Sequence, residues 1–193
     1  TKPYGVGESL TIQKGIQNPD KYYAGDYTNV YTYRWYNLWS MENTITDTYG
    51  TGNDNRVVKT IYDPCPAGFK IPASNAFTFF TKTGQTEYSF TTENFNVVGD
   101  WSVYPPTVYD YGFVFYNKIT NPDATMWAPW GGYRHDWDGL IGQLNSLCFY
   151  WAATPIDYKT HSGMYFYDLS IYPVEGRPIT TGKNIRPVQD KDE

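Results

Sequence analysis

The chain has few of the residues that build catalytic and metal centres. Its 193 residues include two cysteines, two histidines and three methionines. Zinc sites take three or four nitrogen, sulfur or oxygen ligands at characteristic spacings, and the sequence has no paired-histidine motif and no CxxC. Its glycines are dispersed, and none opens a phosphate-binding loop before a helix. We therefore expect no metal, no cofactor and no enzymatic activity.

Charge and long apolar runs are also scarce. Charged residues make up 18% of the chain, and the net charge of -5 is mildly acidic. Duplex nucleic acid requires a basic stripe that neutralises phosphates, so no nucleic-acid partner is expected. No apolar run reaches about 18 residues, so we expect no membrane span. Residues 1–7 have one lysine and no apolar segment, so the signal or anchor of an exported protein would lie outside the printed sequence.

Aromatic residues, in contrast, are abundant. The chain has 20 Tyr, 10 Phe and 7 Trp, which together make up 19% of its residues. Disordered chains contain few aromatic residues, so this composition predicts a folded protein. A chain of this length buries about 70% of the surface that its unfolded form exposes, which is enough for a full core. No linker is visible in the composition, so we predict one domain.

Local patterns predict one clear helix and several strands. The helix covers 74–80, where Ser74 can act as the cap and Phe77 and Phe80 fall on one face. Leucine spacing predicts a second short helix over 138–147. Strands are predicted at 9–13, 111–116, 149–154, 164–171 and 184–188. The long Gly-, Pro- and Tyr-rich stretches between them are predicted to be packed loops.

The two cysteines indicate little chemistry. A disulfide between Cys65 and Cys148 requires close Cα atoms, and two thiols do not make a disulfide framework. Cys148 and His161 are a conceivable nucleophile and base, but no local motif supports that pair. A buried, inert Cys148 is the better interpretation, because free cysteine usually packs as a small hydrophobic residue.

Two polar, aromatic segments, 132–139 and 154–163, are the candidates for recognition. Tyr and Trp together with Ser, Asn, Asp and His are typical of an antibody paratope, and the same side chains stack on sugar rings. The alternative is an ordinary polar loop on an aromatic-rich domain. The predicted ligand contacts are Arg134, His135, Asp136, Trp137, Asp157, Tyr158, Lys159, His161, Tyr165 and Tyr167.

The tripeptide 121–123, Asn-Pro-Asp, is similar to the segment with which calcium-dependent lectins hold both metal and sugar hydroxyls. Calcium takes six to eight oxygen ligands, and one tripeptide supplies too few. The Trp-Asn-Asp partner usual in such lectins is missing, and residues 137–139, Trp-Asp-Gly, match it only in part. We therefore interpret 121–123 as a turn.

Five further motifs occur in an order known from bacterial surface proteins. Residues 62–72 resemble YDPCPxGxRVP, and they are followed by matches to GYR at 132–134, YWSSTP at 150–155, VxP at 171–173 and GxSVRPVxD at 182–190. Together the motifs cover about 57–190. The set resembles the C-type-lectin-like domains of the Fibrobacter succinogenes major paralogous domain family and of Bacteroides fimbrillin-like proteins.

This resemblance implies an α+β, C-type-lectin-like fold with small antiparallel sheets, one or two short helices and long packed loops. It implies a single domain over 1–193, in which 57–190 is the core and 1–56 is a family-variable extension packed on it. It also implies a secreted or cell-surface protein. Some relatives carry a second cysteine where this chain has Pro187, so Cys65 lacks its usual partner here.

The same motifs recur in the variable proteins of diversity-generating retroelements. The scaffold motifs are kept in this chain, whereas 134–138, 147–150, 155–161 and parts of 165–173 differ, which fits either a diversified ligand face or ordinary divergence. An enzyme on the related formylglycine-generating scaffold would need a cysteine pair near the C-terminus. We expect a non-enzymatic, adhesin- or receptor-like module that binds a protein or glycan. The alternatives are a structural pilus or fimbrial subunit and a calcium-dependent carbohydrate-binding lectin.

Overall fold

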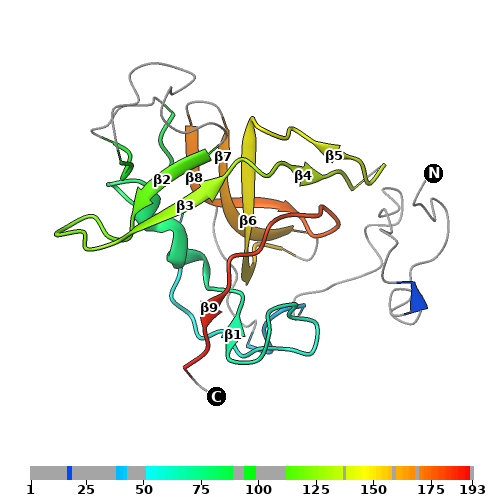
Figure 1. Cartoon of the computed structure of the whole chain (residues 1–193). Coiled ribbons are helices and arrows are strands. Elements are labelled where there is room, and N and C mark those ends of the chain that lie inside the picture. Colours follow the sequence, from blue (N-terminus) through cyan, green and yellow to red (C-terminus); the bar gives the residue numbers. More distant parts are fainter. Residues whose placement is uncertain are drawn as a thin grey trace.

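The computed structural model describes residues 17–18, 38–42, 51–88, 94–98, 112–136, 138–157, 160–167 and 170–191. Its elements in chain order are β1 (Phe69–Lys70), the 3-10 helix η1 (Ser74–Phe80), β2 (Gly112–Tyr116), β3 (Thr125–Pro129), β4 (Tyr133–Arg134), β5 (Ile141–Gly142), β6 (Leu147–Pro155), β7 (Thr160–Tyr167), β8 (Ser170–Pro178) and β9 (Val188–Gln189) (Figure 1). Within these residues, no helix is long and apolar enough to cross a membrane.

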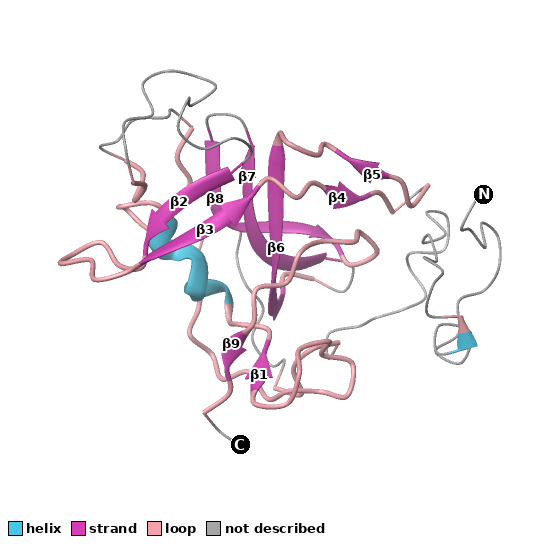
Figure 2. Cartoon of the chain, viewed as in Figure 1, coloured by secondary structure: helices cyan, strands magenta, loops and turns pink. Residues whose placement is uncertain are grey.

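The described part of the chain is largely β, so the α+β class expected from the sequence is wrong (Figure 2). Strand and bridge residues make up 43% of it, and helical residues 6%. The predicted helix at 138–147 is also wrong, because that segment contains β5, a turn and the first residue of β6. The backbone of Gly139, Gln143 and Asn145 has positive φ, which an α-helix does not allow.

The central sheet consists of β6, β7 and β8 in antiparallel order. The predicted strand at 149–154 is confirmed within β6, and the one at 111–116 corresponds to β2. The predicted strand at 164–171 is divided between β7 and β8, and of 184–188 only Val188 lies in a strand, β9. The prediction at 9–13 lies outside the described residues.

The first core lies between this sheet and the β2–β3 hairpin with η1 (Figure 1). Phe80 of η1 meets Phe115 edge-on at 4.1 Å, and Phe113 meets Phe166 of β7 at 5.1 Å. Phe77 and Phe80 share the buried face of the helix, as predicted. Burying each such ring contributes about 1.5–3 kcal/mol, so these rings fix the hairpin against the sheet.

The helix begins differently from the prediction. Ala73 is the N-cap residue, and no side chain caps the helix. Ser74 is fully buried, and its hydroxyl accepts a hydrogen bond from the backbone N–H of Asn53 at 3.1 Å. Ser74 therefore ties the helix to the preceding loop.

A second core packs on the opposite side of β6 and consists of Trp39, Val57, Cys65, Ile71, Trp151 and Ala153. Cys148 belongs to the first core and Cys65 to the second. Side chains of successive strand residues point to opposite faces, so β6 separates the two thiols. Both cysteines are free and buried.

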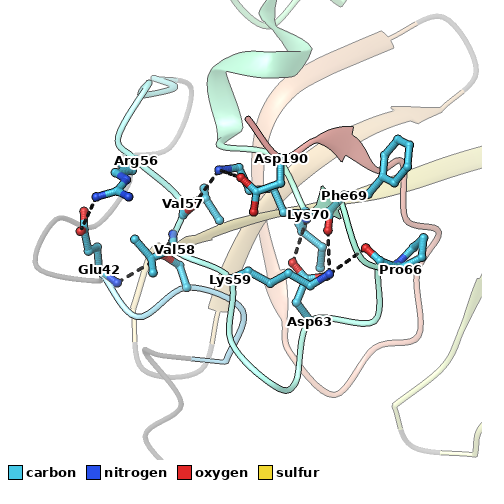
Figure 3. Close-up of polar contacts among 12 residues, drawn as sticks. Glu42, Arg56, Val57, Val58, Lys59, Asp63, Pro66, Phe69, Lys70 and Asp190 are labelled. Carbon is cyan, nitrogen blue, oxygen red and sulfur yellow. Dashed lines mark hydrogen bonds and ion pairs between the residues drawn. The ribbon is translucent and has the colours of Figure 1, made fainter. Parts of the chain in front are cut away.

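The 62–72 motif forms a loop that polar contacts hold closed (Figure 3). We call this loop, together with Lys59, the clasp. The Lys59 ammonium donates hydrogen bonds to the carbonyl oxygens of Cys65, Pro66 and Phe69 at 2.6–2.8 Å. The buried Asp63 carboxylate accepts hydrogen bonds from the backbone N–H groups of Cys65 and Ile71. These contacts close the loop that carries the motif, so its Asp63 and Cys65 serve folding.

The first and last motifs meet in space, because β1 pairs with β9. The Lys70 ammonium lies 2.7 Å from the Asp190 carboxylate and also donates to the carbonyl of Val57 (Figure 3). The backbone N–H of Asp190 donates to Gly68 at 2.8 Å. This pairing joins two segments that are more than a hundred residues apart in the sequence.

Candidate functional site

A row of aromatic side chains lies on the face of the central sheet that is turned away from the first core. Tyr165 of β7 stacks on Phe149 of β6 with ring centres 4.3 Å apart and on Tyr172 of β8 at 5.2 Å. Tyr167 is parallel to Tyr165 at 6.3 Å, and Tyr88 meets Tyr172 edge-on at 5.6 Å. We call these five residues the aromatic row. Cross-strand pairing brings Phe149, Tyr165 and Tyr172 together, because facing residues of neighbouring strands lie on the same side. Tyr167 lies two residues along β7 from Tyr165, and Tyr88 comes to β8 through the bridge between Glu87 and Ile171.

The row runs from the protein interior to the surface. Phe149 is 5% exposed, whereas Tyr167 is 43% and Tyr88 68% exposed. Tyr165 and Tyr172 are half-buried between these limits. Burial raises the pKa of Tyr165 to about 12, so its hydroxyl keeps its proton at neutral pH and can donate a hydrogen bond.

The buried end of the row is cationic. The guanidinium of Arg177 lies 5.0 Å from the ring centre of Tyr165 and 5.4 Å from that of Phe149. The ammonium nitrogen of Lys183 lies 4.7 Å from the centre of the Phe149 ring. Glu175 adds one carboxylate, 3.5 Å from the guanidinium. Cations held over aromatic faces are attracted by the ring quadrupole.

Burial controls the protonation of this cluster. Burial lowers the pKa of Lys183 well below its usual value; the Arg177 charge lowers it further, and Glu175 opposes the shift. Burial raises the pKa of Glu175, and the charges of Arg177 and Lys183 partly oppose that rise. Burial therefore favours the uncharged amine of Lys183, and a bound anion would favour its protonated form.

Three of the predicted contacts, Arg134, His135 and Asp136, lie on the β4–β5 arm, where the first two bind their own loop and the third binds Thr180. The Arg134 guanidinium donates to the carbonyl of Gly139 at 2.8 Å. His135 pairs through Nδ1 with the Asp138 carboxylate at 3.1 Å. Asp136 accepts a hydrogen bond from the Thr180 hydroxyl at 3.4 Å. These side chains therefore have structural partners already.

The arm adjoins the aromatic row through Tyr133. The Tyr133 ring lies 5.0 Å from the ring of His135 and meets Phe149 edge-on at 5.4 Å. His135 and Tyr165 thus belong to one continuous set of ring contacts. The described part of 132–139 is therefore connected to β7 through Tyr133 and Phe149.

The second predicted segment, 154–163, is less accessible to a ligand. His161 is 1% exposed and packs edge-on against Trp39 at 5.0 Å, so a ligand cannot reach it without opening the sheet. The backbone N–H of Asp157 donates to the carbonyl of Thr160, the first residue of β7. Trp137, Tyr158 and Lys159 lie outside the described residues.

Sequence reasoning missed several members of this site: Tyr88, Phe149, Tyr172, Arg177 and Lys183. Tyr172 and Lys183 stand in motifs that were assigned to the scaffold. Tyr172 is recognisable only once the predicted strand is divided into β7 and β8, because their antiparallel pairing places it opposite Tyr165. Lys183 arrives beside β6 through an isolated bridge between Tyr150 and Asn184, which no local pattern indicates.

The 121–123 segment is a turn closed by its own side chains. The Asp123 carboxylate pairs with the Lys118 ammonium at 2.7 Å and accepts a hydrogen bond from the Asn117 amide. The Lys118 contact, followed by Asn117, lowers the pKa of Asp123. Among the described residues, no group of three or more His, Cys, Asp or Glu side chains is placed to hold a metal ion.

Comparisons with protein-family models, curated proteins and solved structures found no match for this chain. They therefore neither support nor oppose the resemblance to bacterial surface proteins. The function has to be argued from the aromatic row, its cationic end and the arm beside it.

Proposed function

We propose that this protein is a non-enzymatic ligand-binding domain of an exported cell-surface protein, adhesin- or receptor-like, and that the aromatic row contacts a protein or glycan on another surface. The observation that carries the proposal is the rising exposure along the row, from Phe149 to Tyr167 and Tyr88. Tyrosine rings supply a large contact area with little loss of conformational entropy on binding. The buried rings hold the exposed ones in place, which preorganises the surface.

The position of the row in the sequence adds support. Phe149, Tyr165 and Tyr167 fall within 147–150 and 165–173, where the chain differs in part from the family motifs, whereas Tyr172 stands in the VxP match at 171–173. A diversified face requires variable side chains on a fixed scaffold, and regular strands provide one. The DNA beside the gene tests this part of the proposal. A near-copy of the 3′ end that differs mainly at adenines, next to a reverse transcriptase gene, is expected, and its absence would contradict diversification.

The binding proposal is tested by screening the full chain against arrays of surface glycans and proteins. The hits are then measured with Tyr167→Ala and Tyr172→Ala. Each should weaken binding by more than fivefold, because interface aromatics often contribute over 1 kcal/mol. Tyr62→Ala is the matched control, because Tyr62 is 40% exposed and belongs to the clasp. Equal binding by all three variants would contradict the proposal.

A second candidate, a structural pilus or fimbrial subunit, is favoured by one observation. Leu140, Ile141 and Leu144 are exposed together on the β4–β5 arm. Exposed apolar groups of this kind often mark protein–protein contacts. If the arm mediates assembly, the chain should form concentration-dependent oligomers in light scattering, and Leu144→Asp should abolish them. A monomer at all concentrations would contradict assembly through the arm.

A further inference from the structure

The cationic end of the aromatic row contains unused hydrogen-bond donors. Within the described part of the chain, the buried Nζ of Lys183 and the buried Nε of Arg177 have no hydrogen-bond partner. The guanidinium reaches Glu175 only at 3.5 Å, longer than the charge-assisted hydrogen bonds of about 2.7–2.9 Å that such groups form. Buried donors are rarely left unsatisfied, because desolvation without a partner is unfavourable.

The two clasp lysines, Lys59 and Lys70, are both hydrogen-bonded to oxygen atoms, as expected of lysines that stabilise the fold. Lys59 donates to three carbonyl oxygens, and Lys70 to the Asp190 carboxylate and the carbonyl of Val57. Lys183 instead faces the rings of Trp151 and Phe149 and meets no oxygen among the described residues. Its donors therefore remain for a group that the described residues do not supply.

We infer that Arg177 and Lys183 form a subsite for the carboxylate of an acidic glycan, whose sugar rings lie along Tyr165, Tyr172 and Tyr167. This inference rests on the proposed function of the aromatic row and specifies its ligand. A guanidinium binds a planar carboxylate through two parallel hydrogen bonds. The Lys183 nitrogen is buried, so it adds a third only where the bound carboxylate reaches past the exposed part of Arg177. The Arg177 side chain is 40% exposed, so it can meet a ligand from solvent.

The chemistry of the row favours a glycan over a peptide. Each tyrosine of the row combines apolar ring atoms with a hydroxyl, and a sugar ring likewise combines an apolar C–H face with hydroxyl groups. Peptide anchors instead fill desolvated pockets. The stacked rings of Tyr165 and Tyr172 leave no recess between them for a side chain, since their centres are 5.2 Å apart.

Binding should be linked to proton uptake. The charged groups that act on Lys183 are Arg177 and Glu175 of β8. Of the other titratable groups nearby, Tyr165 of β7 lies against Arg177, and His161 packs on the Trp151 ring that Lys183 faces. A bound carboxylate adds a negative charge beside the amine and so favours its protonated form. Lys183 should therefore take up a proton when an acidic ligand binds, and the affinity should fall as the pH rises.

The experiment is isothermal titration calorimetry of the full chain with tetragalacturonate, with its methyl ester and with a tetraglutamate peptide. Titrations at pH 8 in buffers of different ionisation enthalpy measure proton uptake. We expect the acid to bind at least tenfold more tightly than the ester, with net uptake. Lys183→Met and Arg177→Gln should each weaken binding of the acid at least tenfold, and Lys183→Met should abolish the uptake.

Arg56→Gln is the charge-matched control, because Arg56 forms an exposed pair with Glu42 in the clasp region. It should bind as the wild type does. Arg177→Gln, a change at a half-exposed residue, keeps the test decisive if Lys183→Met does not fold.

Each other outcome counts against a defined part of the inference. Equal binding of acid and ester, or no binding of either, overturns the carboxylate subsite. If Tyr167→Ala and Tyr172→Ala still weaken binding of an array hit, the proposed function of the row survives that failure. Tighter binding of tetraglutamate than of tetragalacturonate overturns the glycan assignment. If Lys183→Met weakens binding of the acid but Tyr167→Ala and Tyr172→Ala leave it unchanged, the proposed function of the aromatic row is contradicted instead.

Discussion

The ammonium nitrogen of Lys183 lies 3.6 Å from the centre of the Trp151 ring. The chain after β8 returns along β6, where the backbone N–H of Trp151 donates to Asn184 and the N–H of Asn184 donates to Phe149. This path places Lys183 over Phe149 and Trp151 together. The lysine thus stands where the aromatic row meets the second core.

Lys183→Met should stabilise the protein at neutral pH. Because the pKa of Lys183 is lowered in the folded state, the unfolded chain takes up a proton here as the pH falls below about 10.4, whereas the folded chain does not. The free energy of unfolding at pH 7 should therefore rise by about 1–3 kcal/mol, a gain that shrinks as the pH approaches 10. Urea titrations across pH 7–10 measure it. Lys70→Met, which removes the Asp190 pair, should destabilise the protein, and a loss in both variants would contradict the prediction.

Lys59→Met should loosen the clasp. It removes three charge-assisted hydrogen bonds to backbone carbonyls, and hydrogen bonds to charged groups contribute about 1.5–3 kcal/mol each when partly buried. We expect a loss of about 2–3 kcal/mol in the free energy of unfolding, because water can reach two of the carbonyls. Arg56→Met should change it by less than about 1 kcal/mol, since its pair is exposed. Similar losses in both variants would show that the Lys59 contacts contribute little.

Both thiols should be unreactive in the folded protein. Burial raises the pKa of Cys65 to about 12, with help from Asp63, and that of Cys148 to about 11. At pH 8 a thiol reagent should label neither cysteine in buffer and both in urea. Because the unfolded thiols ionise near pH 8.5 and the folded ones do not, stability should fall as the pH rises above about 8.5. Cys148→Ala should show a smaller fall, and fast labelling in buffer would contradict the burial of the thiols.

Gly163→Ala should disrupt the central sheet. An added Cβ would meet the carbonyl oxygen of Tyr150 on β6, where backbone cannot easily move. We expect a loss of about 2–3 kcal/mol, typical of overpacking. Gly84→Ala is the control, because its positive φ costs about 1–2 kcal/mol but its nearest neighbour is 3.7 Å away. Thermal unfolding of both variants decides the point, and a Gly163→Ala variant as stable as the wild type would contradict the expected clash; the irregular pairing between Gly163 and Tyr165 in β7 would then have absorbed the added atom.

Some features of the fold were predictable because they depend on neighbours in sequence. The spacing of Phe77 and Phe80 predicted the buried face of η1, and the run 149–154 predicted the middle of β6. The helix at 138–147 was wrong because leucine spacing ignores the backbone: Gln143 and Asn145 have positive φ, and only Leu147 of the three leucines is buried. His161 was mistaken for a surface residue because polarity alone does not show which face of a strand is covered.

The sequence by itself determined that the chain folds, that aromatic residues dominate it and that Tyr165 and Tyr167 share one face of a strand, because alternation along a strand is local. The tertiary structure decided which aromatic residues became core and which became surface. Phe166 is buried and Tyr167 is exposed although they are adjacent, because one face of β7 is covered by the β2–β3 hairpin and η1. It also brought Arg177 and Lys183 to the buried end of the aromatic row. The pairing of β7 with β8 places Arg177, and the bridge between Tyr150 and Asn184 places Lys183, and both contacts join residues that are distant in sequence.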